Sequence, residues 1–219
     1  MEEKKERVVM KEIKHGDGFT RNYSKYNYNS DGRHYTPSWE EYKTKLNETV
    51  DDSRFYYIMR LGHELGLSPI AVANLKKVFF CSMKPKSIFV ERAKAVLRGS
   101  KLVMRSRLLP VNDSLYIGLK DYIKTHDSDY LIPKVGFGAL TMQAINYLYK
   151  QNKVKWTPHR ARIFFKTQMK VVLIPKGMYD EGEVRKIMGH QPRDSGERYD
   201  DLNFDLAMMY VNEVFARRM

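Results

Sequence analysis

Residues in the C-terminal half of the chain have the types and spacing to act on a phosphodiester. In the run Thr157-Pro158-His159-Arg160-Ala161-Arg162, helical periodicity puts His159 and Arg162 on one face. Thr157 as cap and Pro158 as first residue predict the start of a helix, where free backbone N–H groups and the helix dipole favour an anion. An imidazole and a guanidinium on that face are suited to binding a phosphate.

Two further residues follow along the chain in a fixed order. His190 comes directly after Gly189 at the end of a helix expected over about 180–189, and Tyr199 follows nine residues later. Each has an ordinary structural interpretation, since a helix dipole favours a terminal histidine and Tyr199 is one of 15 tyrosines. Their order after His159 and Arg162 favours the chemical interpretation.

With these residues in this order, the sequence resembles the tyrosine recombinases, the family of phage integrases and chromosome-dimer resolvases. The resemblance covers roughly residues 36–219. Within it, Gly66-Leu67 with Asn74-Leu75 is similar to the helical turn before the family's sheet, and Arg107-Leu108-Leu109-Pro110 to the end of its β-hairpin. The resemblance implies an α+β fold, a mostly helical catalytic domain with a small three-stranded antiparallel sheet.

The resemblance also implies a role for each residue of the site. Tyr199 would be the nucleophile, forming a covalent phosphotyrosyl bond on the 3′ side of the DNA break. Arg162, His159 and His190 would surround the nonbridging phosphate oxygens, and one of the histidines would help to take the tyrosine proton. No cofactor and no metal is expected, and the single cysteine, Cys81, excludes a cysteine-based zinc site.

In the family, a lysine on the β-hairpin donates a proton to the departing 5′ oxygen. In this sequence Arg98-Gly99-Ser100-Lys101 is the expected hairpin tip. Lys101 is therefore the first candidate for the general acid, and Lys94 is the second.

One position departs from the family's pattern. The family's first catalytic arginine follows a Gly-Leu pair, whereas Gly66-Leu67 is followed here by Ser68, and the acid expected three residues later is Ala71. Loss of one such cation costs about 3 to 4 kcal/mol of transition-state stabilisation. Three explanations stay open: Arg60 or Arg54 reaches the site, the protein is a slow or inactive relative that still binds DNA, or the alignment is shifted.

The charge of the chain points to an anionic partner. The 219 residues carry a formal net charge of +13, with ten Lys or Arg against one acid over 76–107 and eight against none over 150–176. Apolar residues interleave these charges, as in folded elements, so we expect double-stranded DNA as the partner and no membrane contact. The residues expected to contact DNA are Lys76, Lys77, Arg92, Lys94, Arg98, Arg105, Lys153, Lys155, Arg160 and Lys166.

Hydrophobic periodicity and turn residues predict the elements that position these groups. Helices are expected from Ser38, capped by a box with Glu41, and over about 52–65, 69–77, 113–125, 138–151, 158–172, 180–189 and 201–217. Strands are expected over 78–83, 88–97 and 102–111.

The two ends of the chain have separate predictions. Residues 1–35 are expected to be a flexible or DNA-contacting arm, shorter than the helical core-binding domain that usually precedes the family's catalytic domain over 36–219. The final helix is apolar on two faces. It is either core or, as in the family, the segment that docks on a neighbouring protomer to build a dimer or tetramer on DNA.

Three functions stay open on the sequence alone. The first is a site-specific recombinase or integrase that breaks and rejoins DNA, and the second is a catalytically impaired DNA-binding relative. The third is a nicking enzyme similar to type IB topoisomerases. The chain lacks a long apolar segment and a signal-peptide core, so we expect a cytoplasmic, DNA-associated protein, which a virus or plasmid could encode.

Overall fold

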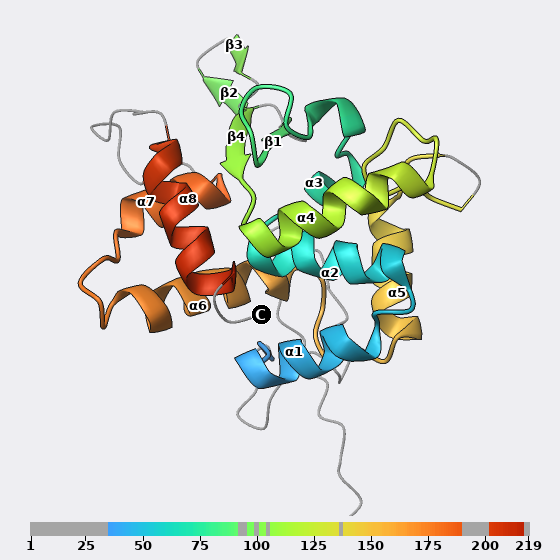
Figure 1. Ribbon diagram of the computed structural model, residues 1–219, viewed down its shortest axis with the longest axis horizontal. Coiled ribbons are helices and arrows are strands. Elements are labelled where there is room, and N and C mark those ends of the chain that lie inside the picture. Colours follow the sequence, from blue (N-terminus) through green and yellow to red (C-terminus); the bar gives the residue numbers. More distant parts are fainter. Residues whose placement is uncertain are drawn as a thin grey trace, which may run out of the picture. The chain divides into compact units, whose positions relative to one another are not determined.

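The computed structural model describes residues 35–91, 96–98, 101–103, 106–135, 138–189 and 202–216, with the backbone alone for 96–98 and 101–103. The helices are α1 (Trp39–Glu48), α2 (Ser53–Glu64), α3 (Pro69–Ala73), α4 (Asp113–Tyr122), α5 (Met142–Gln151), α6 (Arg160–Leu173), α7 (Glu181–Met188) and α8 (Phe204–Val211) (Figure 1). Shorter helical turns are η2 (Lys77–Phe79), η3 (Ile123–Thr125) and the π-helical η4 (Asn212–Ala216).

Side-chain caps begin the first two helices, and the cap of α1 is the box that the sequence predicts. At α1, the Ser38 hydroxyl accepts from the Glu41 amide at 3.2 Å, and the Glu41 carboxylate accepts from the Ser38 amide at 2.9 Å. At α2, the Asp52 carboxylate accepts from the Phe55 amide at 3.0 Å. Each cap satisfies a backbone donor that the first helical turn leaves without a partner.

The strands form a hairpin in two segments. β1 (Ser87–Val90) pairs antiparallel with β4 (Arg107–Pro110), and β2 (Val96–Arg98) pairs with β3 (Lys101–Val103). Arg98 is opposite Lys101 in this register, which confirms the predicted hairpin tip. Figure 1 shows β2 and β3 beyond the end of β1 and β4, away from the helices.

The predicted strand over 78–83 is wrong, and with it the count of three strands. Within the described residues, this segment begins in the 3₁₀ turn η2 and makes a single bridge between Phe80 and Ile88. Cys81 has φ of 58°, a left-handed conformation that interrupts an extended backbone. The mostly helical α+β class with a small antiparallel sheet is confirmed.

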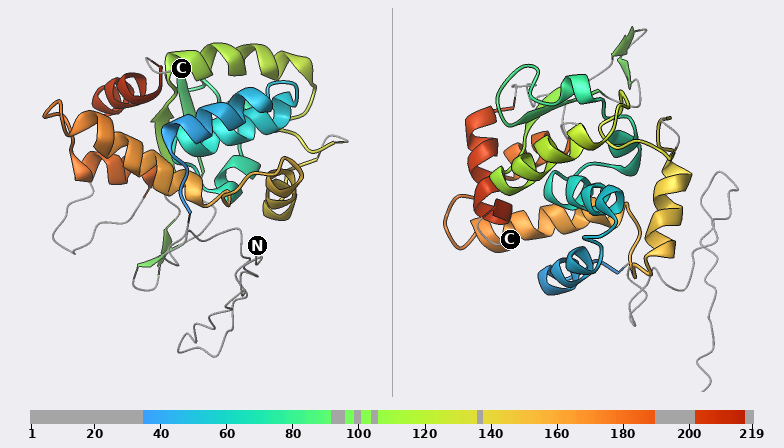
Figure 2. Two further views of the ribbon diagram at one scale, coloured as in Figure 1. Left: turned by 90° about the horizontal axis from the view of Figure 1, so that it is seen from below. Right: turned by 45° about the vertical axis from the view of Figure 1, so that its right-hand side comes forward.

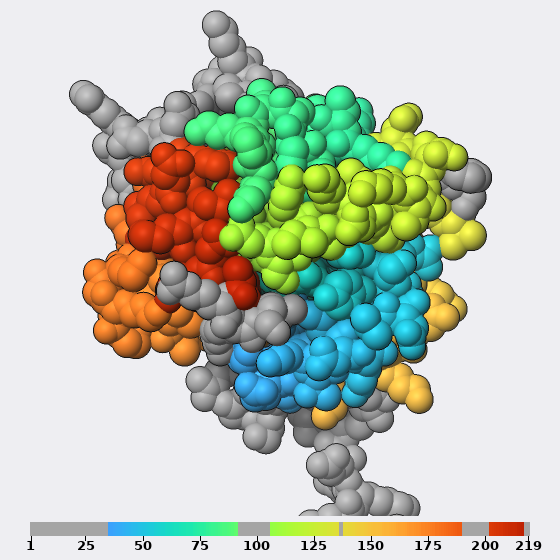
Figure 3. All heavy atoms as spheres, in the orientation of Figure 1, coloured from blue at the N-terminus to red at the C-terminus, as the bar shows by residue number. Residues whose placement is uncertain are grey.

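The C-terminal helices belong to the core of their own chain. Tyr210, Val211, Val214 and Phe215 are buried, and the Phe215 ring stacks on Phe165 of α6 at 5.7 Å between centroids. Figure 2 shows α8 beside α6 and α7 from two sides, and Figure 3 shows it between those helices and α4. The core alternative therefore holds for the buried face of this segment. No helix in the described ranges is both long and apolar enough to span a membrane.

Candidate active site

Arg162 lies where the ends of two other helices meet α6. Its Nη1 donates to the Gly66 carbonyl at 3.0 Å and its Nη2 to the Met188 carbonyl at 2.8 Å. Gly66 follows α2 with φ of +62°, and a Cβ there would lie 2.9 Å from the Phe165 ring. The close approach and the left-handed backbone both require glycine at this point. The Arg162 guanidinium is thus held between the ends of α2 and α7.

The charge of Arg162 is desolvated without a matching carboxylate. Burial lowers the pKa of Arg162, and none of the ion pairs between described residues includes it. Its two hydrogen bonds go to neutral carbonyls and use two of the five N–H donors of a guanidinium. A partly buried cation in this state gains from a bound anion, and its fork geometry suits a phosphate.

His159 lies three residues before Arg162 and is exposed. Burial of part of its ring, followed by the Arg162 charge, lowers the pKa of His159 below its usual value. The imidazole is therefore mostly neutral at pH 7, with one nitrogen able to donate and the other able to accept a proton. The two side chains present a neutral imidazole and a guanidinium at one end of α6.

The start of α6 differs from the prediction. The helix begins at Arg160, with His159 at its N-cap position and no side-chain cap bond, so the predicted cap at Thr157 is wrong. The amides of residues 160–162 each donate to the carbonyl three residues earlier, at 2.9, 3.3 and 3.3 Å. A 3₁₀ turn therefore uses the donors that we expected to be free for an anion. The side chains of His159 and Arg162 must supply the anion contacts at this helix end.

A buried hydrogen-bond chain fixes the segment that leads into α6. The Trp156 indole N–H donates to His63 Nε2 at 2.9 Å, and His63 Nδ1 lies 2.8 Å from the Met59 carbonyl. Because the indole only donates, Nε2 must carry the lone pair and Nδ1 the proton. Burial lowers the pKa of His63 to about 4, so this neutral tautomer persists at pH 7. These hydrogen bonds fix the position of Trp156, which comes three residues before His159.

Ser68 lies at the start of α3, two residues after the Gly66 carbonyl that binds Arg162. Its hydroxyl accepts from the Ala71 amide at 3.3 Å, and Pro69 occupies the first helical position. Ser68 is therefore a helix cap two residues from a carbonyl that Arg162 binds, and it contributes a hydroxyl but no charge.

Arg60 is bound elsewhere and does not replace the absent arginine. It is 3% exposed, and it donates from Nε to Glu64 at 2.6 Å and from Nη2 to the other Glu64 oxygen at 2.9 Å. Glu64 is fully buried and also accepts from Tyr42 at 2.9 Å and Asn112 at 2.8 Å. These contacts neutralise the charge of Arg60 inside the core.

Arg54 also lies away from Arg162 and its two carbonyl partners, Gly66 and Met188, which we call the clamp. It lies in the first turn of α2, whereas Gly66 follows the last turn. A helix of 12 residues is about 18 Å long, which separates the two ends. The explanation that Arg60 or Arg54 reaches the site and replaces the absent arginine is therefore wrong.

The structure brings a further guanidinium to the clamp that the sequence analysis did not select. Arg107, the first residue of β4, donates from Nε to the Ile187 carbonyl at 3.0 Å. Gly189 caps α7 with φ of +67°, and a Cβ there would lie 2.3 Å from Arg107 Nη1. The only signal in the sequence was the position of Arg107 at the end of a basic hairpin.

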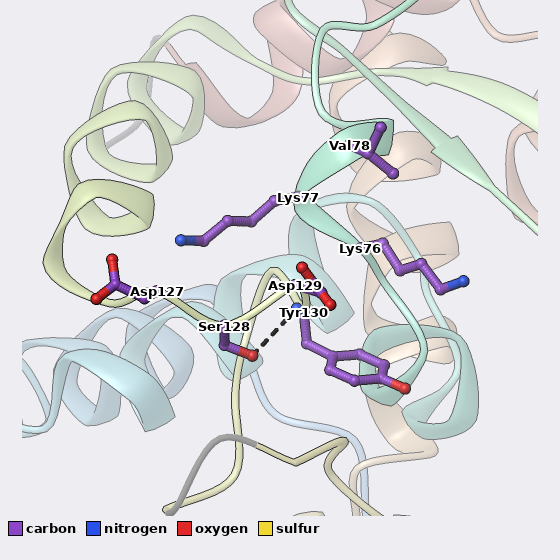
Figure 4. Close-up of a pocket in the computed structure, with 7 residues that line it drawn as sticks. All are labelled: Lys76, Lys77, Val78, Asp127, Ser128, Asp129 and Tyr130. Atoms are coloured by element: carbon purple, nitrogen blue, oxygen red, sulfur yellow. Dashed lines mark hydrogen bonds between the residues drawn. The ribbon is translucent and has the colours of Figure 1, made fainter.

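Lys76 and Lys77 diverge, although both were expected to contact DNA. They border an open hollow of about 600 Å³ that Asp127 and Asp129 also line. Figure 4 shows Lys77 extending toward Asp127 and Lys76 pointing the opposite way. The Lys77 amine donates to the His126 carbonyl, whereas the Lys76 amine is exposed, 5.8 Å from the Phe79 ring centroid. Lys76 is the better placed of the two for a phosphate.

The lysines of the second basic segment also differ among themselves. Lys166 pairs with Glu181 at 2.5 Å and thereby joins α6 to α7. Hydrogen bonds from Lys166 and from Tyr179 lower the pKa of Glu181 to about 2. Lys153 and Lys155 are exposed in the loop before α6. A phosphate contact is therefore more accessible to Lys153 and Lys155 than to Lys166.

Several predicted residues lie outside the described residues. These are His190, Tyr199, Arg92, Lys94 and Arg105, together with the arm over 1–34. Lys101 and Arg98 are described by their backbone only, and Arg160 is half-buried at the first turn of α6. Within the described ranges, no group of His, Cys, Asp and Glu side chains could hold a metal ion.

Comparisons with known proteins agree with this architecture. No family model matches the sequence. The chain is 28% identical over 127 residues to the tyrosine recombinase XerA of Thermococcus onnurineus (strain NA1), over 54% of this chain and 43% of that protein. The chain thus matches less than half the length of this curated relative.

Solved structures show the same fold. The crystal structure of XerA recombinase matches with a TM-score of 0.58 and 20% identity, over 72% of this chain and 57% of that chain. The integrase of the Tn1549 transposon, in complex with circular intermediate DNA, matches with 0.56 and 17%, over 80% and 60%. The lambda integrase catalytic core matches with 0.55 and 12%, over 77% and 98%. The resemblance to tyrosine recombinases is confirmed, and the chain has the fold of their catalytic domain.

Proposed function

We propose that this protein is a site-specific DNA recombinase or integrase that breaks and rejoins DNA through a 3′-phosphotyrosyl intermediate. The observation that carries the proposal is the Arg162 guanidinium, desolvated, bound to two carbonyls and accompanied by the neutral His159. It occurs in the fold of the tyrosine recombinase catalytic domain. The pair of side chains is suited to binding a phosphate, and the proteins that share this fold are recombinases and integrases. Both observations favour a DNA phosphate as the anion.

Tyr199 is the proposed nucleophile. Its phenolic oxygen forms a bond to phosphorus, the bond from phosphorus to the 5′ oxygen breaks, and the phenolic proton passes to His159 or His190. Lys101 donates a proton to the departing 5′ oxygen. One phosphodiester replaces another, so a 5′ hydroxyl can reverse the reaction and rejoin the strand without ATP or a metal ion. Arg162 stabilises the charge that grows on the nonbridging oxygens.

Double-stranded DNA is the proposed substrate. The charge excess over 150–176 surrounds the start of α6, and the excess over 76–107 follows the hairpin that carries Lys101. Exposed Lys76, Lys153 and Lys155 are proposed to bind the phosphate backbone, which fixes register without reading sequence. The relatives named above are recombinases and integrases, and one of them is in complex with DNA. We propose the DNA-containing cytoplasm as the place of action.

A dimer or tetramer on DNA is the proposed assembly, with α8 as its contact. Met209 is 44% exposed on α8, while the opposite face of that helix is buried in its own chain. We expect Met209→Glu to weaken assembly on DNA in analytical ultracentrifugation without lowering the melting temperature. Ile117→Glu, at an exposed position on α4, is the matched control. Unchanged assembly of Met209→Glu would exclude α8 as the contact.

Ser68 favours a second candidate, a DNA-binding relative that no longer cuts. The residue caps α3 two residues after the Gly66 carbonyl that binds Arg162, so this position has a structural role and lacks a cation. Binding to DNA depends on the sum of many phosphate contacts and would change little on losing one, whereas catalysis would be strongly slowed.

A nicked suicide duplex separates the two candidates. The target is sought in the DNA that flanks the gene, and a nick beside the cleavage point lets the short 5′-hydroxyl fragment diffuse away and traps the covalent complex. The recombinase proposal predicts a covalent protein–DNA band that Tyr199→Phe abolishes and that Tyr147→Phe, at an exposed tyrosine of α5, preserves. A bound but never covalent wild-type protein would support the second candidate, and Ser68→Arg would then be expected to restore the band.

A further inference from the structure

We propose that Arg107 supplies the second guanidinium of the phosphate site, in place of the arginine that is absent at Ser68. The inference rests on the proposed function and deepens it, because it assigns a second cation to the same scissile phosphate.

Two guanidiniums are anchored on consecutive carbonyls at one helix end. Arg107 Nε donates to Ile187 at 3.0 Å, and Arg162 Nη2 donates to Met188 at 2.8 Å. Consecutive Cα atoms are about 3.8 Å apart, so the two anchors are one residue apart at the C-terminus of α7. Arg107 comes from the hairpin and Arg162 from α6, and both converge on this point.

Gly189 makes room for the Arg107 guanidinium. A Cβ at this position would lie 2.3 Å from Nη1 and 2.6 Å from Cζ of Arg107, so the planar group rests against the glycine backbone. The left-handed φ of +67° also favours glycine there. His190, a third group of the predicted site, follows Gly189 directly in the sequence.

Both guanidiniums are bound at a helix end that favours cations. The carbonyls at the end of α7 and the helix dipole stabilise positive charge there. A guanidinium is a planar fork of five N–H donors, so it can bind a carbonyl and an anion at the same time. A bound phosphate, with two nonbridging oxygens, could accept from both arginines at once.

A role as helix cap alone is the alternative explanation for Arg107. A cap would stabilise α7 regardless of the charge on the DNA. A phosphate contact would instead depend on that charge, and this dependence separates the two roles.

The experiment compares two suicide substrates in the covalent-complex assay, one with a phosphodiester and one with a methylphosphonate at the cleavage point. In the methylphosphonate a methyl group replaces one nonbridging oxygen and removes the negative charge. On the phosphodiester we expect Arg107→Ala to slow covalent complex formation about 10²- to 10³-fold, as for other lost transition-state donors. On at least one methylphosphonate stereoisomer the loss should shrink to less than about tenfold, because a neutral phosphate needs one cation fewer.

Three controls accompany this variant. Arg162→Ala should respond in the same way, and Lys124→Ala, which removes an exposed charge of η3, should match the wild type on both substrates. Thermal unfolding checks the fold, and Arg107→Lys takes the place of the alanine variant if that variant does not fold. An equal loss on both substrates, or no loss, would overturn the role of Arg107. Absence of a Tyr199-dependent band from the wild type on both substrates would instead refute the proposed function.

Discussion

Two arginines of this protein point inward and differ in what they bind. Arg60 donates twice to the buried carboxylate of Glu64, and Arg162 donates twice to backbone carbonyls. Burial by itself would lower the pKa of Arg60, but the Glu64 charge outweighs it and the pKa is raised. The pKa of Arg162 is lowered by burial with no such compensation.

The difference separates a structural arginine from a chemical one. The charge of Arg60 is neutralised within the core, so it stabilises the packing of α2 and is closed to a ligand. The charge of Arg162 is positioned by dipoles and remains available to an anion. Mutations at the two places should therefore affect different properties, stability in one case and DNA chemistry in the other.

The largest expected effect on stability is at Arg60. Arg60→Ala would leave the Glu64 carboxylate buried without its counter-charge, which costs about 3 to 5 kcal/mol of unfolding free energy. Urea unfolding measures this loss. The double variant Arg60→Met/Glu64→Leu should lose less than the single variant, because it removes both charges and leaves only the neutral donors of Tyr42 and Asn112 without an acceptor. A single variant as stable as the double one would contradict the structural assignment.

Arg162 should show the opposite behaviour. Arg162→Lys keeps a charge but lacks the planar fork, and we expect covalent complex formation to slow about 10²- to 10³-fold. The loss of unfolding free energy should be only about 1 to 2 kcal/mol, since hydrogen bonds to two carbonyls are altered without stranding a charge. Single-turnover kinetics and urea unfolding measure the two quantities. A stability loss as large as that of Arg60→Ala would remove the contrast.

The stability that His63 provides to the segment before α6 should decrease in acid. The pKa of His63 is lowered from 6.5 to about 4, so its contribution to stability is complete above pH 6.5 and is lost as pH falls from 6.5 toward 4. Protonation would also displace the Trp156 hydrogen bond. The shift corresponds to a loss of about 3 kcal/mol of unfolding free energy.

Urea unfolding at a series of pH values tests this dependence. His63→Gln should be less stable at pH 7 and show a flatter profile below pH 6.5. His159→Gln, at an exposed histidine, should leave most of the profile in place. A wild-type profile that is flat between pH 6.5 and 4 would contradict the assignment of a neutral, hydrogen-bonded His63.

The smallest expected effect is at Ser68. Ser68→Ala removes the α3 cap and should cost about 1 kcal/mol of unfolding free energy, with no change in the rate of covalent complex formation. Ser68→Asn keeps a capping side chain and is the matched control. A rate loss with Ser68→Ala that Ser68→Asn does not share would show that the hydroxyl takes part in the chemistry.

Local signals in the sequence predict part of this structure. The Ser38 cap, the start of a helix near residue 52 and the hairpin tip between Arg98 and Lys101 depend on neighbouring residues, and the structure confirms all three. Two predictions are wrong: the cap of α6 at Thr157 and the strand over 78–83. A 3₁₀ turn changes the backbone at the first, and the left-handed conformation of Cys81 changes it at the second.

The composition of the clamp could not be predicted in the same way. Arg60, Arg107 and Arg162 have the same side chain, and only tertiary contacts distinguish their partners. The pairing of Arg60 with Glu64 one turn later could have been anticipated from helical spacing. The contact of Arg107 with Ile187 spans 80 residues and depends on how the hairpin packs against α7.

The salt dependence of DNA binding tests the contrast between these arginines most directly. The logarithm of the association constant falls linearly with the logarithm of salt concentration, by about 0.9 for each phosphate that the protein neutralises. Arg162→Gln should therefore reduce the magnitude of this slope by about 0.9, and Arg60→Met/Glu64→Leu should leave it unchanged. An unchanged slope for Arg162→Gln, or an equal reduction for the core double variant, would contradict the availability of the Arg162 charge to DNA.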